Sequence, residues 1–192
     1  MLLLFTLLSA SAFATDLDAE KRRTNDGRGR MLRTYDEAVV DSTPEEVWAA
    51  LSDYGQVHDI AGAVYEAGYI GEPTLEMDCE RYCKIEFGGR DVYVEEHVVE
   101  LHEGSYYTYE VTESEGFPLK RMFVTFGVYV NDGGETVVYN ITDYKLKPSV
   151  MSGPMRGQME ASNQSSVLSY KHYVETGIGN IPADELAQMY RP

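Results

Sequence analysis

The chain has 192 residues, with 16 lysines and arginines against 32 aspartates and glutamates, so its formal net charge is −16 at pH 7. A chain this acidic is repelled by nucleic acids and by anionic lipid surfaces, which excludes both as partners. Its length suits one domain with a sizeable hydrophobic core.

An apolar run opens the sequence. Residues 1–14 are rich in Leu and end in small residues, with Ala12 and Ala14 framing a cleavage site. This pattern is typical of a signal peptide, and the run is too short to span a membrane. We therefore expect a secreted or periplasmic protein without stable membrane insertion after the signal is removed. Residues 15–31 are polar, charged and non-periodic, which indicates a flexible leader.

The first expected elements of the domain are a strand and a helix. Residues 32–41 have the composition of a strand. In the sequence Thr-Pro-Glu-Glu at 43–46, the threonine and the last glutamate make a capping box, with proline at the first helical position. This pattern predicts a helix that starts there and ends at Gly55. Residues 56–61 favour a short second helix.

Strand-like segments separated by Gly-rich or acidic turns continue from residue 64 to residue 146. The predicted strands are Val64–Ile70, Met77–Phe87, Arg90–Leu101, Ser105–Thr112, Arg121–Val130 and Thr136–Leu146. Together with residues 32–41 they give a curved antiparallel sheet of about six to seven strands. The order of a strand, two helices, a run of strands and one long helix is an α+β layout, in which the sheet folds around the last helix.

The last long element is a helix within residues 150–177, and Gly177 stands where a helix usually stops. One stripe of this helix consists of flexible methionines, small serines and tyrosines, whereas a close-packed core normally presents leucine and isoleucine. Its residues are Met155, Met159, Ser162, Ser166, Tyr170 and Tyr173. We interpret the stripe as the wall of a cavity; the alternative is a loosely packed or half-exposed helix. In the tail at 178–192, residues 182–189 favour a short helix.

The predicted turns allow the inner face of the sheet to be derived. A two-residue turn at Gly88-Gly89 places Arg81 opposite Glu96, with Cys83 and Val94 on the same face. Two-residue turns at 103–104 and 132–133 would add four aromatic residues to this face, namely Tyr107, Tyr109, Phe126 and Tyr139. The inner surface is therefore expected to be apolar and aromatic, with one charged pair.

These residues and the helix define a predicted ligand-binding site, made of Arg81, Glu96, Tyr107, Tyr109, Phe126, Tyr139, Met155 and Met159. The arginine and the glutamate would orient a polar group of the ligand. The alternatives are a structural ion pair, or a slipped register that turns both side chains to water. For the tyrosines the alternative is ordinary strand packing. The apolar loop 116–119 either gates the cavity mouth or packs as an ordinary loop.

No catalytic or metal-binding motif accompanies this site. The sequence contains no Gly-x-Ser-x-Gly elbow, no phosphate-binding glycine loop and no His-Glu-x-x-His helix, and its four histidines are scattered. Cys79 and Cys83 are separated by about 13 Å if the chain is extended, so a disulfide between them requires a turn or a bulge. We predict no catalytic residue, no metal and no cofactor.

Several pieces of the chain resemble the SRPBCC superfamily, the START-like helix-grip group that includes polyketide cyclases, dehydrases and lipid-transport proteins. They are residues 40–54 with Thr-Pro-Glu-Glu-Val-Trp, residues 81–83 leading into Phe-Gly-Gly at 87–89, Glu95-Glu96 and the strand at 109–111. The similarity extends over Tyr35 to Thr176, and the connection at 117–119 is similar to that of exported bacterial members. The resemblance implies a helix-grip ligand-binding domain, at 32–177, with a cavity between the sheet and the long helix.

Members of such a group range from enzymes to carriers, so the fold does not decide the activity. The first hypothesis is an exported, non-catalytic protein that binds a hydrophobic small molecule, either a lipid or a polyketide-like compound. The second is a cyclase or dehydratase that uses the same cavity, with Glu96 as its base. The third is a periplasmic interaction module whose acidic surface binds a basic protein. The sequence indicates neither the ligand nor the oligomeric state.

Overall fold

The computed structural model describes residues 31–191, so the predicted signal peptide and nearly all of the predicted leader lie outside the described residues. Seven antiparallel strands form one sheet in the order β1-β7-β6-β5-β4-β3-β2. Their bounds are Leu32–Val40 (β1), Val64–Ile70 (β2), Glu80–Glu86 (β3), Asp91–His102 (β4), Tyr106–Glu115 (β5), Leu119–Val130 (β6) and Thr136–Leu146 (β7).

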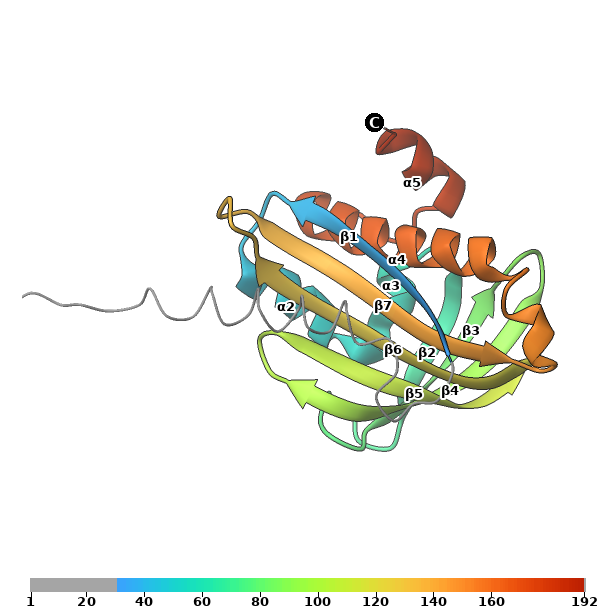
Figure 1. The fold of residues 1–192 in the computed structure, drawn as a ribbon. Helices are drawn as coiled ribbons and strands as arrows, with labels where there is room; N and C mark the ends of the chain where they lie inside the picture. Colours follow the sequence, from blue (N-terminus) through green and yellow to red (C-terminus); the bar gives the residue numbers. More distant parts are fainter. Residues whose placement is uncertain (1–30, 192) are drawn as a thin grey trace, which may run out of the picture.

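The sheet curves around one long helix, α4 (Arg156–Thr176), which lies along the sheet on one side (Figure 1). This arrangement confirms the predicted α+β helix-grip layout. Among the helices of residues 31–191, none is both long enough and apolar enough to cross a membrane.

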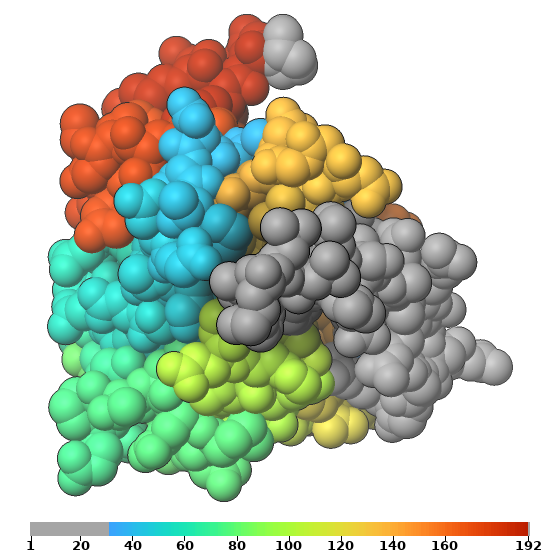
Figure 2. Space-filling view, turned by 90° about the vertical axis from the view of Figure 1, so that its left-hand side faces the viewer, coloured from blue at the N-terminus to red at the C-terminus, as the bar shows by residue number. Residues whose placement is uncertain are grey.

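Two short helices and a 3-10 turn connect β1 to β2: α2 (Pro44–Ser52), η1 (Tyr54–Gln56) and α3 (Val57–Ile60). The predicted capping box is present, because the Thr43 hydroxyl accepts from the Glu46 N–H and the Glu46 carboxylate accepts from the Thr43 N–H. α2 ends before Gly55, since the chain tightens into η1 there. Figure 2 looks at this end of the molecule, where the blue and teal atoms of these elements pack between the strands and the C-terminal helices.

α4 begins later than predicted and ends where predicted. Residues Ser149–Met151 form a 3-10 turn, η2, ahead of it. At its end Gly177 has a φ of 73°, and its N–H donates to Tyr173 O at 2.7 Å. Glycine adopts this left-handed conformation without the steric penalty of a Cβ atom. The tail continues into α5 (Ala183–Met189), which is anchored by the fully buried Leu186.

The register of the β3–β4 hairpin is the predicted one, with Arg81 opposite Glu96. In the β4–β5 hairpin, a bulge between Val98 and Glu100 changes the pairing along the strands. Val98 lies opposite Tyr109 as expected, but Tyr107 lies opposite Leu101 and not opposite Glu100.

The β6–β7 register differs from the prediction by one residue. The loop contains three residues, 132–134, with Gly134 at a φ of 80°, where a two-residue turn was expected. A three-residue loop that ends in a left-handed glycine is a common hairpin connection. Phe126 therefore lies opposite Asn140 and not opposite Tyr139. Because side chains alternate between faces, the shift turns Tyr139 to the outer face and Asn140 to the inner face.

Candidate functional site

A cavity of about 380 Å³ lies between the inner face of the sheet and α4. Side chains from strands β2 to β7, from α3 and from α4 line it, and most of them are apolar. Five of the predicted site residues are in the lining: Arg81, Glu96, Tyr109, Phe126 and Met159. Ser162, Ser166 and Tyr170 of the helical stripe line it too, as the cavity-wall interpretation predicts.

Arg81 and Glu96 form a buried ion pair in the cavity wall. The two residues are only 2% and 3% exposed, and Arg81 Nε donates to Glu96 Oε2 at 2.5 Å. Arg81 Nη1 also donates to the backbone oxygen of Tyr54 at 2.5 Å, and the guanidinium carbon lies 3.8 Å from the centre of the Tyr54 ring. The arginine therefore links β3 to η1 as well as lining the cavity.

The arginine keeps its charge in this environment. Burial lowers the pKa of Arg81, but the carboxylate of Glu96, together with the nearby side chains of Cys83, Tyr54 and Tyr109, more than offsets this effect, so the net shift of the pKa is upward. A guanidinium that is already bonded to a carboxylate and a carbonyl is electrically neutralised. The pair can orient a polar group, but it presents no free positive charge.

The two cysteines are free thiols. Cys83 lies beside the ion pair, with its Sγ atom 4.0 Å from Glu96 Oε2, and burial raises the pKa of Cys83 to about 12. Burial also raises the pKa of Cys79, which precedes β3. Both thiols are therefore protonated near neutral pH and are poor nucleophiles.

Tyr107 lies on the inner face but not in the cavity lining, which corrects its predicted position. Its ring is fully buried and packs edge-on against Tyr54 and Trp48, with centroid distances of 5.4 and 6.3 Å. α2 and η1 supply these partners, and the hairpin register alone could not reveal how these elements cover the sheet. Tyr107 therefore belongs to the aromatic packing that closes this end of the domain.

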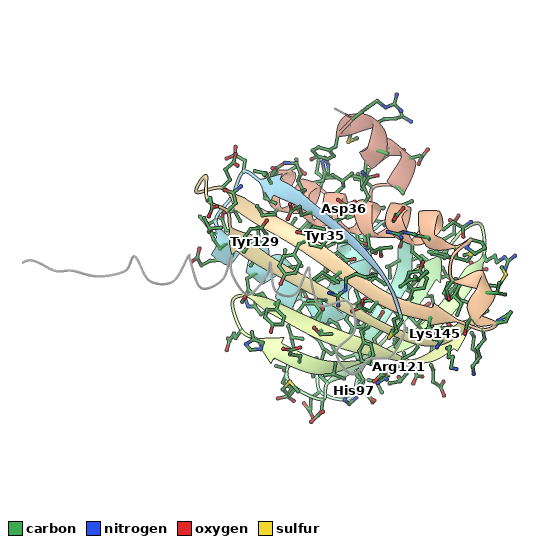
Figure 3. The ribbon with its side chains drawn as sticks, viewed as in Figure 1. Tyr35, Asp36, His97, Arg121, Tyr129 and Lys145 are labelled. Atoms are coloured by element: carbon green, nitrogen blue, oxygen red, sulfur yellow. The ribbon has the colours of Figure 1, made fainter. Side chains whose placement is uncertain are left out.

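Tyr139 lies on the outer face of the sheet, which also corrects its predicted position. Its ring stacks near Tyr35 at 6.5 Å and meets Tyr129 at 6.0 Å, and Figure 3 labels these two neighbours. A Cβ atom at Gly127, the cross-strand partner of Tyr139, would lie 2.5 Å from its hydroxyl oxygen. The ring thus covers a glycine and has no access to the cavity.

Met155 lies outside the cavity lining, because α4 starts only after it. It packs with Phe87, Phe117 and Leu119 around the buried Tyr144 and Met159. The rings of Phe87 and Phe117 meet edge-on at 5.1 Å, and both also line the cavity. The apolar loop 116–119 is therefore part of the cavity wall, at the end opposite α2.

A second polar group in the lining was missed by sequence reasoning. Asn140 and Thr142 from β7 and Asn163 from α4 are all buried and line the cavity. Thr142 Oγ1 lies 2.9 Å from Asn163 Oδ1, which joins the helix to the sheet. The sequence Asp-Gly-Gly at 132–134 also suits a three-residue loop, and only that choice places Asn140 and Thr142 on the inner face.

The other polar residues in the lining are Glu86, Gln158 and serines at 114, 162, 165, 166 and 169. None of the lining residues is a histidine, and within residues 31–191 there is no cluster of His, Cys, Asp and Glu that could hold a metal ion. Burial raises the pKa of Tyr170 to about 12 and raises the pKa of Tyr109 well above its ordinary value. Their hydroxyls therefore stay protonated and can donate hydrogen bonds.

A curved seven-stranded antiparallel sheet around a long C-terminal helix, with an internal cavity between them, defines a helix-grip protein. The fold recurs in solved structures of low sequence identity. Ginseng major latex-like protein 151 from Panax ginseng has a TM-score of 0.61 and 16% identity, over 79% of this chain and 99% of that chain. Zhui aromatase/cyclase from a Streptomyces species has a TM-score of 0.61 and 13% identity, over 78% and 99%. Ara h 8.0201 has a TM-score of 0.59 and 16% identity, over 75% and 97%.

The family model described as polyketide cyclase/dehydrase and lipid transport matches residues 31–175. The chain therefore belongs to this family, within the SRPBCC superfamily. A search of curated protein sequences finds no match.

Proposed function

We propose that the protein binds a hydrophobic small molecule, of lipid or polyketide type, in the cavity between the sheet and α4. The observation that carries the proposal is a mostly apolar cavity of about 380 Å³, in which the one basic lining residue of the described part of the chain, Arg81, is already paired. Enclosed apolar surface favours ligand burial by about 25 cal/mol per Å², before the costs of binding are subtracted. The family description, which includes lipid transport, is consistent with a carrier.

Native mass spectrometry of the protein purified from its own cells tests the proposal, since a carrier should retain a lipophilic compound. A second arm uses Ser166→Trp, which would fill the cavity from α4, and should abolish binding of the neutral dye Nile red. Gln164→Trp is the matched control, because Gln164 is exposed on the same helix. A protein that carries no compound and binds no dye would contradict the proposal.

An enzymatic use of the same cavity is the second candidate. It is favoured by Glu96, a carboxylate in the lining, and by the family description, which names polyketide cyclases and dehydrases. In this case Glu96 would remove a proton from a bound poly-β-ketone during cyclisation. Turnover of such a substrate by the wild type, and its loss in Glu96→Gln with binding retained, would establish the enzyme.

We also propose that the protein is exported. The apolar residues 1–14, which lie outside the described residues, carry this part of the proposal through their resemblance to a signal peptide. Expression in a bacterial host, followed by fractionation and intact-mass measurement, should yield a periplasmic or secreted chain that begins at Thr15. A cytoplasmic protein that retains residues 1–14 would contradict export.

A further inference from the structure

The polar group formed by Asn140, Thr142 and Asn163 is separated from the Arg81–Glu96 ion pair by apolar side chains. Asn140 and Thr142 belong to β7, whereas Arg81 and Glu96 belong to β3 and β4, and the strands β5 and β6 lie between them. Tyr109, Val124 and Phe126 of these two strands line the cavity. The Arg81–Glu96 pair and the group of Asn140, Thr142 and Asn163 are therefore two separate polar positions in the lining.

Among the hydrogen-bonding atoms of Asn140, Thr142 and Asn163, one has no partner. Asn140 Nδ2 donates to Thr125 O at 3.3 Å, so its Oδ1 is the atom that faces Thr142. Thr142 Oγ1 lies 3.2 Å from Asn140 Oδ1 and 2.9 Å from Asn163 Oδ1, but a hydroxyl has only one hydrogen to donate. Asn163 Nδ2 is buried and has no partner.

Rotating the Asn163 amide by half a turn resolves the competition for the Thr142 hydrogen. Asn163 then donates to Thr142, Thr142 donates to Asn140, and Asn140 donates to Thr125, so that each donor is used once. The amide oxygen of Asn163 then takes the buried position at which Nδ2 finds no partner in the observed orientation. An unsatisfied polar atom on a side chain that is only 3% exposed is costly unless a bound molecule supplies the bond.

The charges around the cavity restrict what that molecule can be. Among residues 31–191, Arg81 is the only basic residue in the lining, and Glu96 and Tyr54 already accept from it. Of the acidic residues in the same lining, Glu96 is paired with Arg81 and Glu86 is exposed. A ligand carboxylate or phosphate would therefore lose its hydration without meeting a free cation, which disfavours anionic ligands.

We propose that Asn163 determines the ligand specificity of the cavity by binding the hydroxyl group of a neutral, otherwise apolar molecule. A hydroxyl both donates and accepts, so it completes the hydrogen bonding of Asn163 in either orientation of the amide. The inference rests on the proposed function, because Asn163 can select a ligand only if the cavity binds one.

Three straight-chain probes of equal length test this inference: decanol, decane and decanoate, each displacing Nile red at neutral pH. Comparing each probe between wild type and variant cancels the difference in their aqueous solubilities. We expect Asn163→Leu to weaken decanol binding by about tenfold and to leave decane binding unchanged or tighter, since only decanol loses a hydrogen bond. Gln164→Leu is the matched control, because it makes the same amide-to-leucine exchange at an exposed position of the same helix, and it should leave decanol binding unchanged.

The outcomes distinguish a failure of the proposed role of Asn163 from a failure of ligand binding itself. If decanol and decane respond equally to Asn163→Leu, or if Gln164→Leu weakens decanol binding as much, the role of Asn163 is wrong while ligand binding stands. If the wild type bound decanoate more tightly than decanol, the inference that the ligand is a neutral molecule would be wrong. If neither Nile red nor any probe binds the wild type, the proposed function itself fails. Circular dichroism checks folding, and Asn163→Ala repeats the comparison if the leucine variant does not fold.

Discussion

At the scale of single residues, the Arg81–Glu96 pair combines a structural contact with a place in the cavity wall. Its guanidinium bonds to a carboxylate on β4 and to a backbone carbonyl of η1, so three elements meet at one side chain. Because both residues are almost completely buried, water cannot replace a missing partner. Removing one member should therefore leave an uncompensated charge in the core.

We expect Glu96→Gln to lower the free energy of unfolding by about 3 to 5 kcal/mol, measured by urea titration, because Arg81 loses its counter-charge. The double variant Arg81→Met with Glu96→Leu should recover most of this loss, since no charge remains to be desolvated. Lys84→Met is the control, because it breaks the ion pair between Lys84 and Glu66. These two side chains are 39% and 46% exposed, so the loss should cost less than about 1 kcal/mol. Equal losses for the buried and the exposed pair would show that burial does not govern these energies.

The two thiols should differ in reactivity. Cys83 is 1% exposed with a pKa raised to about 12, whereas Cys79 is partly exposed. At about pH 8 we expect Cys79 to react readily with a disulfide reagent in the native protein. Cys83 should react more slowly than Cys79 by on the order of a hundredfold until the protein is denatured. Cys79→Ser should remove the fast reaction. A fast reaction that persists in this variant would place Cys83 within reach of solvent.

At the scale of elements, local sequence signals predicted the ends of helices and the bounds of two strands. The capping box fixed the start of α2, Gly177 fixed the end of α4, and β2 and β7 have the predicted bounds. The register between β6 and β7 could not be predicted in the same way, because the sequence Asp-Gly-Gly at 132–134 suits both a two-residue and a three-residue loop. One residue in the turn decides the face of every side chain that follows, so Tyr139 was placed wrongly and Asn140 was overlooked.

Two glycines near the ends of α4 should respond in opposite directions to alanine. Gly177 has a φ of 73°, and a Cβ atom there would meet nothing within 4 Å, so only backbone strain opposes Gly177→Ala, at about 1 kcal/mol. Gly157 lies in the first turn of the helix with equally open space, and Gly157→Ala should be neutral or stabilising by up to about 0.5 kcal/mol. Thermal unfolding of both variants checks the contrast. Equal destabilisation would mean that the left-handed cap does not distinguish the two sites.

At the scale of the whole molecule, the layout and the cavity could be predicted but the chemistry of the cavity only in part. The methionine and serine stripe indicated a cavity wall without knowledge of the sheet, because such side chains fill a core poorly. The Arg81–Glu96 pair followed from one hairpin turn. Asn163 could not be recognised in advance, since its importance depends on Thr142, 21 residues away, which faces inward only in the observed register.

Buried tyrosine hydroxyls and a buried cysteine thiol, all uncharged in the folded state, make the stability of the protein sensitive to high pH. Burial raises the pKa of Cys83 and of Tyr170 to about 12, and it raises the pKa of Tyr54, Tyr107 and Tyr109 well above the ordinary value. In the unfolded chain the cysteine loses its proton near pH 9 and the tyrosines near pH 10. Between these values and about pH 12 the folded state binds more protons than the unfolded state, so stability falls as pH rises.

The urea midpoint should therefore be constant up to about pH 8 and should decrease steadily towards about pH 11. Tyr170→Phe removes one of the buried hydroxyls and should reduce the slope of this decrease, even if it changes stability at neutral pH. Tyr65→Phe is the control, because Tyr65 is 53% exposed and its substitution should leave the slope unchanged. A midpoint that does not change between about pH 8 and pH 11 would contradict the neutral, buried state of these side chains.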